Sequence, residues 1–390
     1  MIRNFILLLT FLTLSFTIQS KEYLVQLKTG ASLPSHYSAR KIADNIYLIK
    51  TFNKFTKINL SMNSNIEIIE ENLKIDAPIM PESMTSKQWG LYGTAGIKAK
   101  KAWNITEGSK DVLIAIIDTG IDYNHPDLKE NIWTNEAELN GEPGIDDDGN
   151  GYVDDIHGYD FLNHDGDPMD DHSHGTHCAG IIGAVHNDIG VNGVMAHVKM
   201  MPLKFIGKRG GSVAGAIEAI EYGIKMHVDI MSNSWGGGGY SVLLENAIKK
   251  AEKAGILFVA AAGNDGQNNN VGSHYPSNFN VDNIIAVAAH NKYDGLAYFS
   301  NYGSNTVDVS APGQDILSTV PNNKYKSYSG TSMATPFVSG IAGLLLSVNP
   351  SLSPEAIKDI LTSTVFKAEA YSGKLISEGR VDAEKALLSL

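Results

Sequence analysis

The 390-residue sequence is short of cysteine and of basic residues. Its single cysteine, Cys178, excludes a disulfide within the chain. The chain has 31 Lys and Arg against 43 Asp and Glu, a formal net charge of −12. Most of the acidic excess lies in residues 81–390, which carry 22 basic and 37 acidic side chains. This balance argues against nucleic acid or an anionic membrane as a partner and suits the binding of multivalent cations.

Long apolar runs are also scarce, and the clearest one is at the N-terminus. Arg3 precedes an apolar run over residues 5–18, which at about 14 residues is short of the roughly 20 needed to span a bilayer. Ile18 and Ser20 suit positions −3 and −1 of a cleavage site. We expect residues 1–20 to be a signal peptide, and the mature protein to be secreted to the medium or periplasm without a membrane attachment. An uncleaved anchor is the alternative.

Residues 21–80 differ in composition from the rest of the chain. They contain few glycines and three β-rich runs, at 23–27, 46–50 and 66–69. These features are typical of a small α+β unit, too small to be very stable alone. Pro78 and Pro81 punctuate the stretch that follows, so residues 81–87 are expected to be a cleavable linker. Residues 21–80 fit a propeptide, with a permanent accessory domain as the alternative.

From residue 88 onward, expected strands and helices alternate. Apolar runs typical of strands buried on both faces lie at 112–117, 198–203, 229–232, 256–262 and 284–288. Helical patterns lie at 214–226, 242–254 and 331–348. Strands separated by helices predict an α/β domain over residues 88–390, with a mostly parallel sheet covered on both faces.

Asp118 is the first catalytic candidate, in the segment IIDTGID at 116–122. It stands at the carboxyl end of the first buried strand, the end at which catalytic groups gather in open α/β sheets. An aspartate there also caps helices or binds nucleotides, so the residue alone does not decide the chemistry.

His174 is the second candidate, in HSHGTHCAG at 172–180. Ser173 is expected to cap the following helix, and an imidazole on its first turn can face a nucleophile with one nitrogen and a carboxylate with the other. A zinc site built on His172, His174 and His177 is the alternative. It lacks an i, i+4 histidine pair or a His-Glu-x-x-His pattern.

Ser332 is the third candidate, in SGTSMATP at 329–336. It opens an apolar helix, where unpaired backbone N–H groups and the positive end of the helix dipole favour developing negative charge. A serine in this position can also be a simple N-cap.

The segments DTGID, HGTH and GTSMATP, in this order, resemble the subtilisin-like serine proteases. The resemblance covers roughly residues 88–390, and Cys178 matches the members related to thermitase and proteinase K. It implies a three-layer fold around a mostly parallel central sheet, preceded by a small α+β propeptide. It also implies that Asp118 orients the imidazole, His174 acts as general base and then acid, and Ser332 attacks the carbonyl.

The same resemblance implies further residues around a peptide substrate. Asn264, in AAAGNDG at 260–266, matches the side-chain amide of the oxyanion hole, although Asn-Asp-Gly is also a turn sequence. Two backbone edges would pair with the substrate, and a pocket would take the residue before the scissile bond. The edges and walls implied are Gly210, Gly211, Ser234, Trp235, Gly236, Ala262 and Gly263. At the far side this chain carries His274, where some relatives have glycine, and the histidine either narrows the pocket or makes it polar.

An acidic loop predicts a calcium site. The segment 146–155 reads DDDGNGYVDD, with oxygen-bearing residues at the spacing of an EF-hand loop through its ninth position. The expected ligands are Asp146, Asp148, Asn150, Asp154 and the carbonyl of Tyr152. The twelfth position is His157 rather than glutamate, so the closing ligand must come from Asp155, Asp160 or elsewhere. An acidic, solvated loop is the alternative.

A second calcium site follows from the resemblance alone. Its implied ligands are the side chains of Gln88, Asp127 and Asn187 and the carbonyls of Val185, Ile189 and Val191.

The function expected is secreted endoproteolysis of extended polypeptides through an acyl-enzyme on Ser332, made as a self-processed zymogen. The expected partners are polypeptide substrates and the chain's own propeptide, and the expected state is a monomer. Two alternatives stay open: a protease dedicated to maturing specific partner proteins, and a calcium-dependent binding protein without catalysis.

Overall fold

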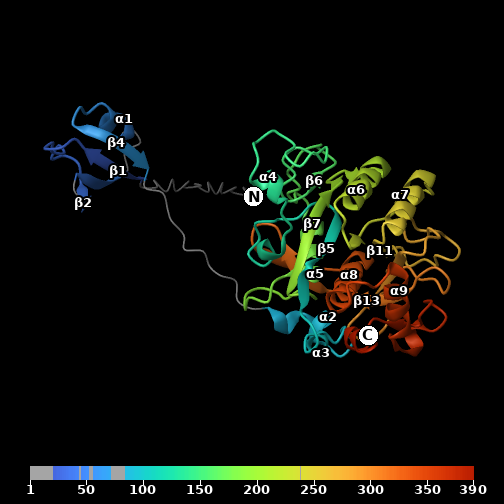
Figure 1. The fold of residues 1–390 in the computed structure, drawn as a ribbon. Coiled ribbons are helices and arrows are strands. Elements are labelled where there is room, and N and C mark those ends of the chain that lie inside the picture. Colours follow the sequence, from blue (N-terminus) through green and yellow to red (C-terminus); the bar gives the residue numbers. More distant parts are fainter. Residues whose placement is uncertain (1–20, 44, 52–55, 72–83, 238) are drawn as a thin grey trace, which may run out of the picture. The chain divides into compact units, whose positions relative to one another are not determined.

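The structure, a computed structural model, describes residues 21–43, 45–51, 56–71, 84–237 and 239–390. The expected signal peptide therefore lies outside the described residues, as does most of the expected linker. The chain divides into two compact units, Met1–Ile79 and Met80–Leu390 (Figure 1).

The first unit is a four-stranded antiparallel sheet with one helix. Its strand order is β2-β3-β1-β4, and its elements are β1 (Lys21–Leu27), β2 (Ala39–Ala43), β3 (Ile46–Thr51), α1 (Thr56–Ser61) and β4 (Ile66–Glu71). The three β-rich runs of the sequence coincide with β1, β3 and β4. Its core is small, made of Tyr23, Val25, Leu27, Ile49 and Leu60. A core of this size provides little stability to a unit on its own.

The second unit contains a nine-stranded sheet in the order β16-β17-β13-β12-β11-β10-β5-β7-β6. All neighbouring strands are parallel except β16 and β17. The strands are β5 (Gly108–Asp118), β6 (Tyr159–Asp160), β7 (His197–Lys204), β10 (Ile230–Asn233), β11 (Leu257–Ala261), β12 (Ile284–His290), β13 (Val309–Pro312), β16 (Phe366–Lys367) and β17 (Gly379–Arg380). Two hairpins lie outside this sheet, β8 (Ile206–Gly207) with β9 (Gly210–Gly211) and β14 (Ile316–Val320) with β15 (Lys324–Tyr328).

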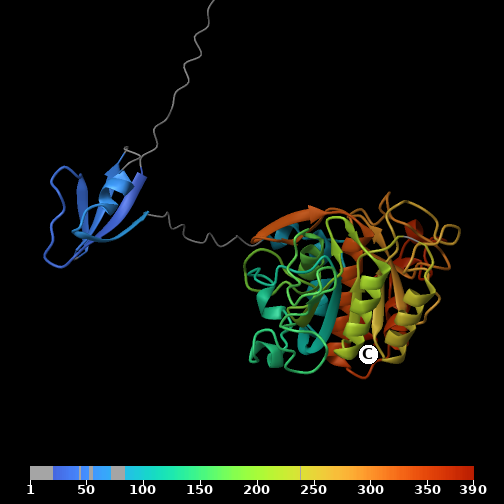
Figure 2. The same cartoon turned by 90° about the horizontal axis from the view of Figure 1, so that it is seen from above.

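The central strand β5 is apolar on both faces because helices cover both. Ile114 and Ile116 point into one hydrophobic cluster, while Ala115 and Ile117 point into the other. Helices α5 (His174–Gly183) and α8 (Thr331–Val348) contribute to the first cluster, and α6 (Val213–Lys225) and α7 (Val242–Lys253) to the second. The two helical layers can be followed in Figures 1 and 2. The predicted α/β fold with a mostly parallel central sheet is confirmed.

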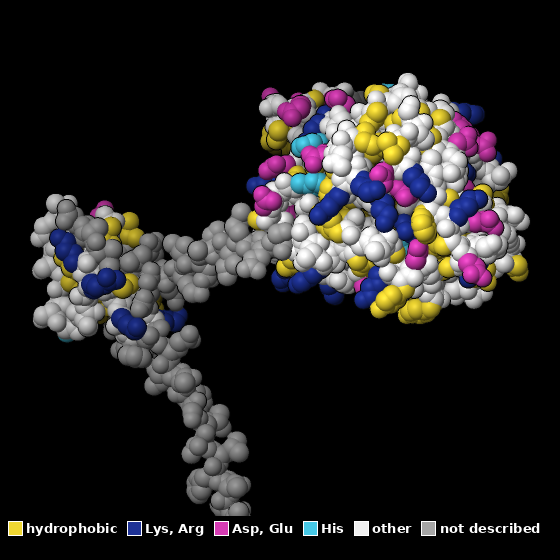
Figure 3. All heavy atoms as spheres, turned by 90° about the horizontal axis from the view of Figure 1, so that it is seen from below, with side chains coloured by type: hydrophobic (Ala, Val, Ile, Leu, Met, Phe, Trp, Pro, Cys, Tyr) yellow, Lys and Arg dark blue, Asp and Glu magenta, His cyan; other side chains and the backbone are white. Residues whose placement is uncertain are grey.

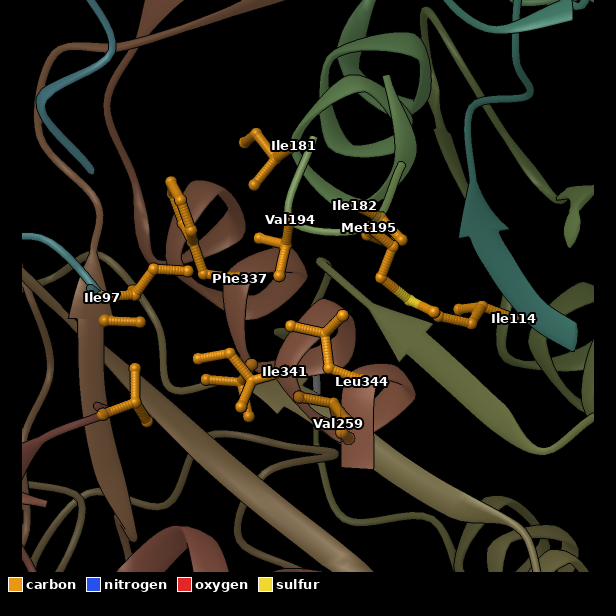
Figure 4. Packing of buried hydrophobic residues seen from close by; sticks show 14 of the residues in the cluster. Ile97, Ile114, Ile181, Ile182, Val194, Met195, Val259, Phe337, Ile341 and Leu344 are labelled. Atoms are coloured by element: carbon orange, nitrogen blue, oxygen red, sulfur yellow. The ribbon is translucent and has the colours of Figure 1, made fainter. Parts of the chain in front are cut away.

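Helix α8 is the centre of the larger cluster. Phe337, Ile341 and Leu344 project from it toward side chains of the sheet, such as Val259 on β11, and toward Ile181 of α5 (Figure 4). Among the described residues it is the one helix long and apolar enough to cross a membrane, but most of it is buried inside the protein. It is therefore the core helix of a globular unit.

Serine and aspartate caps define where several helices begin. The side chains of Ser212, Ser241, Ser353 and Asp382 accept backbone N–H bonds at the starts of α6, α7, α9 (Pro354–Ser363) and α10 (Ala383–Leu388). The remaining short helices are η1 (Thr85–Lys87), α2 (Trp89–Tyr92), α3 (Ala99–Ala102), η2 (Lys129–Asn131), α4 (Glu136–Leu139) and η3 (Glu369–Tyr371). On the face seen in Figure 3, basic and acidic side chains of this unit are interspersed.

Candidate active site

Asp118 and His174 form a buried hydrogen-bonded pair. Asp118 ends β5, and His174 opens α5. Nδ1 of His174 lies 2.8 Å from Oδ1 of Asp118 and 3.0 Å from Oδ2. The side chain of Asp118 is 1% exposed and that of His174 is 26% exposed. The carboxylate thus fixes the ring through Nδ1, and Nε2 remains available for a reacting group.

Asp170 holds the turn that carries His174, a role that the sequence analysis missed. Its carboxylate accepts hydrogen bonds from the hydroxyls of Thr119 and Thr176 and from the backbone N–H groups of Thr176, His172 and Ser173, at 2.6–3.0 Å. Ser173 occupies the N-cap position but does not cap the helix, contrary to expectation, since its hydroxyl is bonded to that of Tyr328. Asp170 lies four residues before the first residue of α5, outside the N-cap position, so no local capping pattern marks its role.

The electrostatics of this turn favour protonation of His174. Burial disfavours the imidazolium, but the adjacent carboxylate of Asp118 and the nearby one of Asp170 outweigh it and raise the pKa of His174 above 6.5. An imidazole held by a carboxylate at Nδ1, with Nε2 left for a reacting group, is suited to accept and return a proton during one reaction cycle.

Ser332 is the second residue of α8 and lies near the Asp118–His174 pair. Its Oγ donates to the carbonyl of Ser234 at 2.9 Å, and no hydrogen bond joins it to His174 in the described part of the chain. Cys178 links the two, because its Sγ lies within 4.8 Å of ligand atoms of Asp118 and His174 and 3.5 Å from the carbonyl of Ser332. A hydrogen bond from Oγ to Nε2 would replace the one that Oγ donates to Ser234. Catalytic hydrogen bonds often form only when substrate is bound.

Cys178 itself is fully buried, and burial raises the pKa of its thiol. It is therefore a protonated packing residue, not a nucleophile. His177 is also buried, its pKa is lowered to about 3 by desolvation, and its Nε2 is bonded to the carbonyl of Lys326. Since His177 is bonded to a backbone carbonyl and His174 to Asp118, the three histidines do not form the alternative zinc site.

Asn264 presents a side-chain amide to the pocket that contains Ser332. Its Oδ1 accepts from the backbone N–H and the hydroxyl of Thr331, at 2.8 and 3.0 Å. The amide is therefore held with its NH₂ group turned away from Thr331. Asn264 and Ser332 line the same cavity, of ≈ 230 Å³. The arrangement places a donor where an oxyanion formed by attack of Ser332 would need one.

The expected substrate residues line two adjoining cavities. The one beside Ser332 is lined by Ser234, Trp235, Gly236, Gly263 and His274, while Ala262 is buried behind it. A neighbouring groove of ≈ 300 Å³ runs between Gly211 and Gly236, over the aromatic rings of Phe205, Trp235 and Tyr275. Gly210 and Gly211 form β9, paired with β8. The two backbone edges thus flank one groove.

Comparison with known proteins identifies the family. The profile of the Subtilase family matches residues 109–384. The chain belongs to the subtilase family of serine proteases. The match spans most of the unit that contains Asp118, His174, Asn264 and Ser332.

Individual relatives agree with this assignment. The thermophilic serine proteinase of Bacillus sp. (strain AK1) is 34% identical over 366 residues, covering 90% of this chain and 84% of that protein. Subtilisin-like protease 1 of Plasmodium berghei is 37% identical over 350 residues, covering 83% of this chain but 58% of its own length. For the Plasmodium falciparum (isolate 3D7) protein of that name the identity is 36%, and the chain spans 43% of its length. A solved protease structure from Pseudoalteromonas arctica superposes with a TM-score of 0.65 at 30% identity, covering 80% of this chain and 99% of that one.

The acidic loop of this subtilase gathers carboxylates, though not the full expected set. Oxygens of Asp148, Asp155 and Glu138 lie within 4.8 Å of one another. Asn150 belongs to the same group, since its side-chain nitrogen contacts Asp148 and Asp155. Glu138, on α4, was not foreseen, because it precedes the loop by eight residues.

Two expected ligands in this loop have other partners. Asp146 accepts the backbone N–H groups of Asn150 and Gly151, and Asp154 accepts that of Gly144. Tyr152 packs its ring against Tyr159 and Tyr222. Lys225 donates to the carbonyl of Asn150 at this loop, but no ion pair joins it to the three clustered carboxylates in the described part of the chain, and oxygens of this kind suit a hard divalent cation such as Ca²⁺.

The second expected calcium site centres on Asp127, which is fully buried. Its Oδ2 accepts the N–H of Val191 at 3.0 Å, and its Oδ1 lies 3.3 Å from the side-chain nitrogen of Asn187. Burial raises the pKa of Asp127. The backbone N–H of Val185 donates to the carbonyl of Asp127. The backbone N–H of Ile189 donates to Oδ1 of Asn187. Gln88 instead pairs both atoms of its amide with the backbone of Asn192, next to Val191.

Proposed function

We propose that this subtilase is a secreted serine endopeptidase that cleaves extended polypeptides through an acyl-enzyme on Ser332. The observation that carries the proposal is the buried Asp118–His174 pair beside a pocket that holds both Ser332 and the amide of Asn264. A binding protein without catalysis has no need of a buried carboxylate aimed at Nδ1 of an imidazole that is 26% exposed. The aligned relatives named as proteases support the same function.

The first half-reaction forms the acyl-enzyme. Oγ of Ser332 attacks the peptide carbonyl carbon while Nε2 of His174 takes the hydroxyl proton, and Asp118 stabilises the imidazolium through Nδ1. The carbonyl oxygen becomes an oxyanion, which accepts hydrogen bonds from the side-chain NH₂ of Asn264 and the backbone N–H of Ser332. When the intermediate collapses, the C–N bond breaks and His174 returns its proton to the leaving amine.

The second half-reaction repeats these steps with water. His174 removes a proton from the water as its oxygen attacks the ester carbon, and the same donors hold the new oxyanion. Breakdown releases the carboxylic acid and returns the proton to Ser332. The serine is thus regenerated, and net chemistry is hydrolysis of one peptide bond.

The groove between Gly211 and Gly236 supports an extended substrate. Both glycines lack a side chain that would hold a bound backbone away, and Ser234–Gly236 continue past the end of β10. An extended polypeptide can therefore add between the two edges through main-chain hydrogen bonds. This mode of binding favours unfolded or loop segments of protein substrates.

Calcium would bind at two places and stabilise the fold without taking part in the chemistry. Glu138, Asp148, Asn150 and Asp155 would hold one ion, and Asp127 with Asn187 and the backbone of 185–191 would hold the other. The first group brings three carboxylates within 4.8 Å of one another, and the second places the carboxylate of Asp127 beside the side chain of Asn187; hard divalent cations such as Ca²⁺ prefer oxygen ligands of this kind.

We further propose that residues 1–20 are removed on secretion and that residues 21–80 act as a propeptide, cut off within residues 76–87 by the enzyme's own site. The small core of the first unit supports this proposal, since a removable unit does not need independent stability.

The test is to compare the wild type with Ser332→Ala and with Ser351→Ala, which changes an exposed serine. Intact mass and N-terminal analysis should show processed wild type and Ser351→Ala, but Ser332→Ala kept as the precursor. A fluorophosphonate should label the first two on Ser332 and leave the third unlabelled. Casein hydrolysis should fall by about 10⁶-fold, a magnitude taken from subtilisin. Unchanged hydrolysis by Ser332→Ala would refute the function, and a processed Ser332→Ala would refute self-cleavage alone.

A further inference from the structure

The imidazole of His274 forms part of the lining of the pocket beside Ser332. The ring of His274 lies between the backbones of Gly236 and Gly263, which form two walls of that pocket. A Cβ added to Gly236 would lie 2.1 Å from Cε1 of this ring, and one added to Gly263 would lie 2.8 Å from Cδ2. The ring is therefore in close contact with both walls and forms part of the lining of a pocket of ≈ 230 Å³.

The backbone and one ring nitrogen of His274 are held from behind. Its N–H donates to the side chain of Asn278, and its carbonyl accepts from the N–H of Asn278 and the hydroxyl of Ser277. Since Ser277 donates its proton to that carbonyl, its oxygen is left as an acceptor for Nδ1, 3.4 Å away. The neutral ring then carries its proton on Nδ1 and presents a lone pair at Nε2.

Nε2 has no hydrogen-bond partner among the described residues, so it is the polar atom of the ring left for a ligand. The other lining residues, Ser234, Trp235, Gly236, Ala261, Gly263, Asn264, Thr331 and Ser332, are uncharged. Tyr275, Ser277 and Asn278, which follow His274 in the chain, are uncharged too, and the charged group that acts on the ring is Asp265. Burial lowers the pKa of His274, and Asp265 opposes that lowering.

We propose that His274 determines which side chain is accepted before the scissile bond, by hydrogen bonding to it through Nε2. The neutral ring selects a side chain that can donate, such as the amide of glutamine, over an apolar one of equal length. The protonated ring donates from Nε2 and so accepts a carboxylate, and glutamate gains on glutamine as the pH falls. This inference rests on the proposed function, because it describes the same pocket.

The test uses peptides that differ only in the residue before the cleaved bond, which is Gln, Glu or Met. The quantity measured is kcat/KM between pH 5.5 and 8.5, expressed as the ratios Glu to Gln and Gln to Met. Titration of His174 affects all substrates equally and cancels in a ratio. For the wild type we expect the ratio of kcat/KM for the Glu peptide to that for the Gln peptide to rise about tenfold as the pH falls from 8.5 to 5.5. At pH 8 we expect kcat/KM for the Gln peptide to exceed that for the Met peptide by about tenfold.

Three variants separate the ring from its surroundings. His274→Gln keeps a hydrogen-bonding side chain without titration, so the Glu to Gln ratio should become flat. His274→Gly removes the ring, so the ratio of kcat/KM for the Gln peptide to that for the Met peptide should fall. His227→Gln, which replaces an exposed histidine after α6, should keep the wild-type profile.

A flat Glu to Gln ratio in wild type, or an unchanged slope in His274→Gln, would overturn the inference while leaving the protease activity in place. The wild-type profile alone decides the matter if a variant does not fold. Absence of cleavage of every peptide and of casein would instead contradict the proposed function.

Discussion

Asp118 and Asp127 are both fully buried aspartates of the same unit, yet their partners differ. Asp118 has an imidazole against both oxygens and the N–H of Thr119 on one of them. Asp127 has one backbone N–H, a long contact to Asn187 and the hydroxyl of Tyr325 nearby, and no lysine or arginine pairs with it in the described part of the chain. Buried carboxylates that lack a cation are costly.

The same contrast separates Asp170 from the Glu138, Asp148 and Asp155 cluster. Asp170 accepts five hydrogen bonds from hydroxyls and backbone N–H groups. The cluster also accepts hydrogen bonds from backbone N–H groups, Asn135, Asn150 and Tyr222, but it brings three carboxylates within 4.8 Å of one another. We therefore expect the catalytic edge to be held by the chain itself and the acidic loop to gain stability from a bound ion. Changes at the first should act on rate, and changes at the second on stability.

The largest effect is expected for Asn264→Ala at the catalytic edge. Loss of the side-chain donor to the oxyanion should lower kcat by about 10²–10³, as it does in subtilisin. The response of the melting temperature to a chelator should stay unchanged, because the side-chain hydrogen bonds of Asn264 in the described residues go to Thr331 and not to an acidic loop. A variant whose stability becomes chelator-dependent would break the separation between the two regions.

Asp170→Asn should have the next largest effect. An amide cannot accept all five donors, so the turn carrying His174 loosens and kcat/KM at pH 8 should fall about tenfold. Because Asp170 helps to raise the pKa of His174, the acid limb of the pH–rate profile, above pH 6.5 in wild type, should move to lower pH. Kinetics against pH measures both.

The control for that variant is Asp171→Asn. The neighbouring carboxylate is 53% exposed and pairs with Lys204, so its removal should leave the acid limb in place. An equal shift in both variants would mean that general charge, not the network around Asp170, sets the titration of His174.

Removal of calcium should lower the melting temperature by about 5 °C or more, since an ion bound 100-fold above its Kd contributes about 2.7 kcal/mol. Glu138→Gln should reduce this chelator-induced shift, while Glu142→Gln, which changes an exposed residue before the loop, should not. Calorimetry with and without EDTA measures the difference. Equal shifts in the two variants would exclude Glu138 as a ligand.

The smallest effect is expected for Cys178. Because its thiol is buried and protonated, Cys178→Ala should keep kcat within about tenfold, with a loss of stability of about 1–2 kcal/mol for the small cavity. A thiol reagent should not modify the folded wild type. Rapid modification would show that the packing around His174 opens in solution.

The sequence predicted the catalytic region better than the ion sites for a physical reason. Strands buried on both faces, such as β5, and helices with serine caps leave local patterns that can be read residue by residue. Asp118 ends β5, and His174 and Ser332 lie in the first turns of α5 and α8, although no side chain caps these two helices. Glu138 and Asp170 act through contacts across loops, which no local periodicity records. The tight fit of His274 between two glycines is likewise a property of three separate segments.

Helix α8 also determines at which stage of folding the catalytic site can form. The nucleophile sits at the start of a helix whose remaining length is enclosed by strands and by α5. Ser332 and His174 can meet only after the sheet has closed around that helix. A chain that has not yet folded, or one that has begun to unfold, therefore lacks an assembled catalytic site.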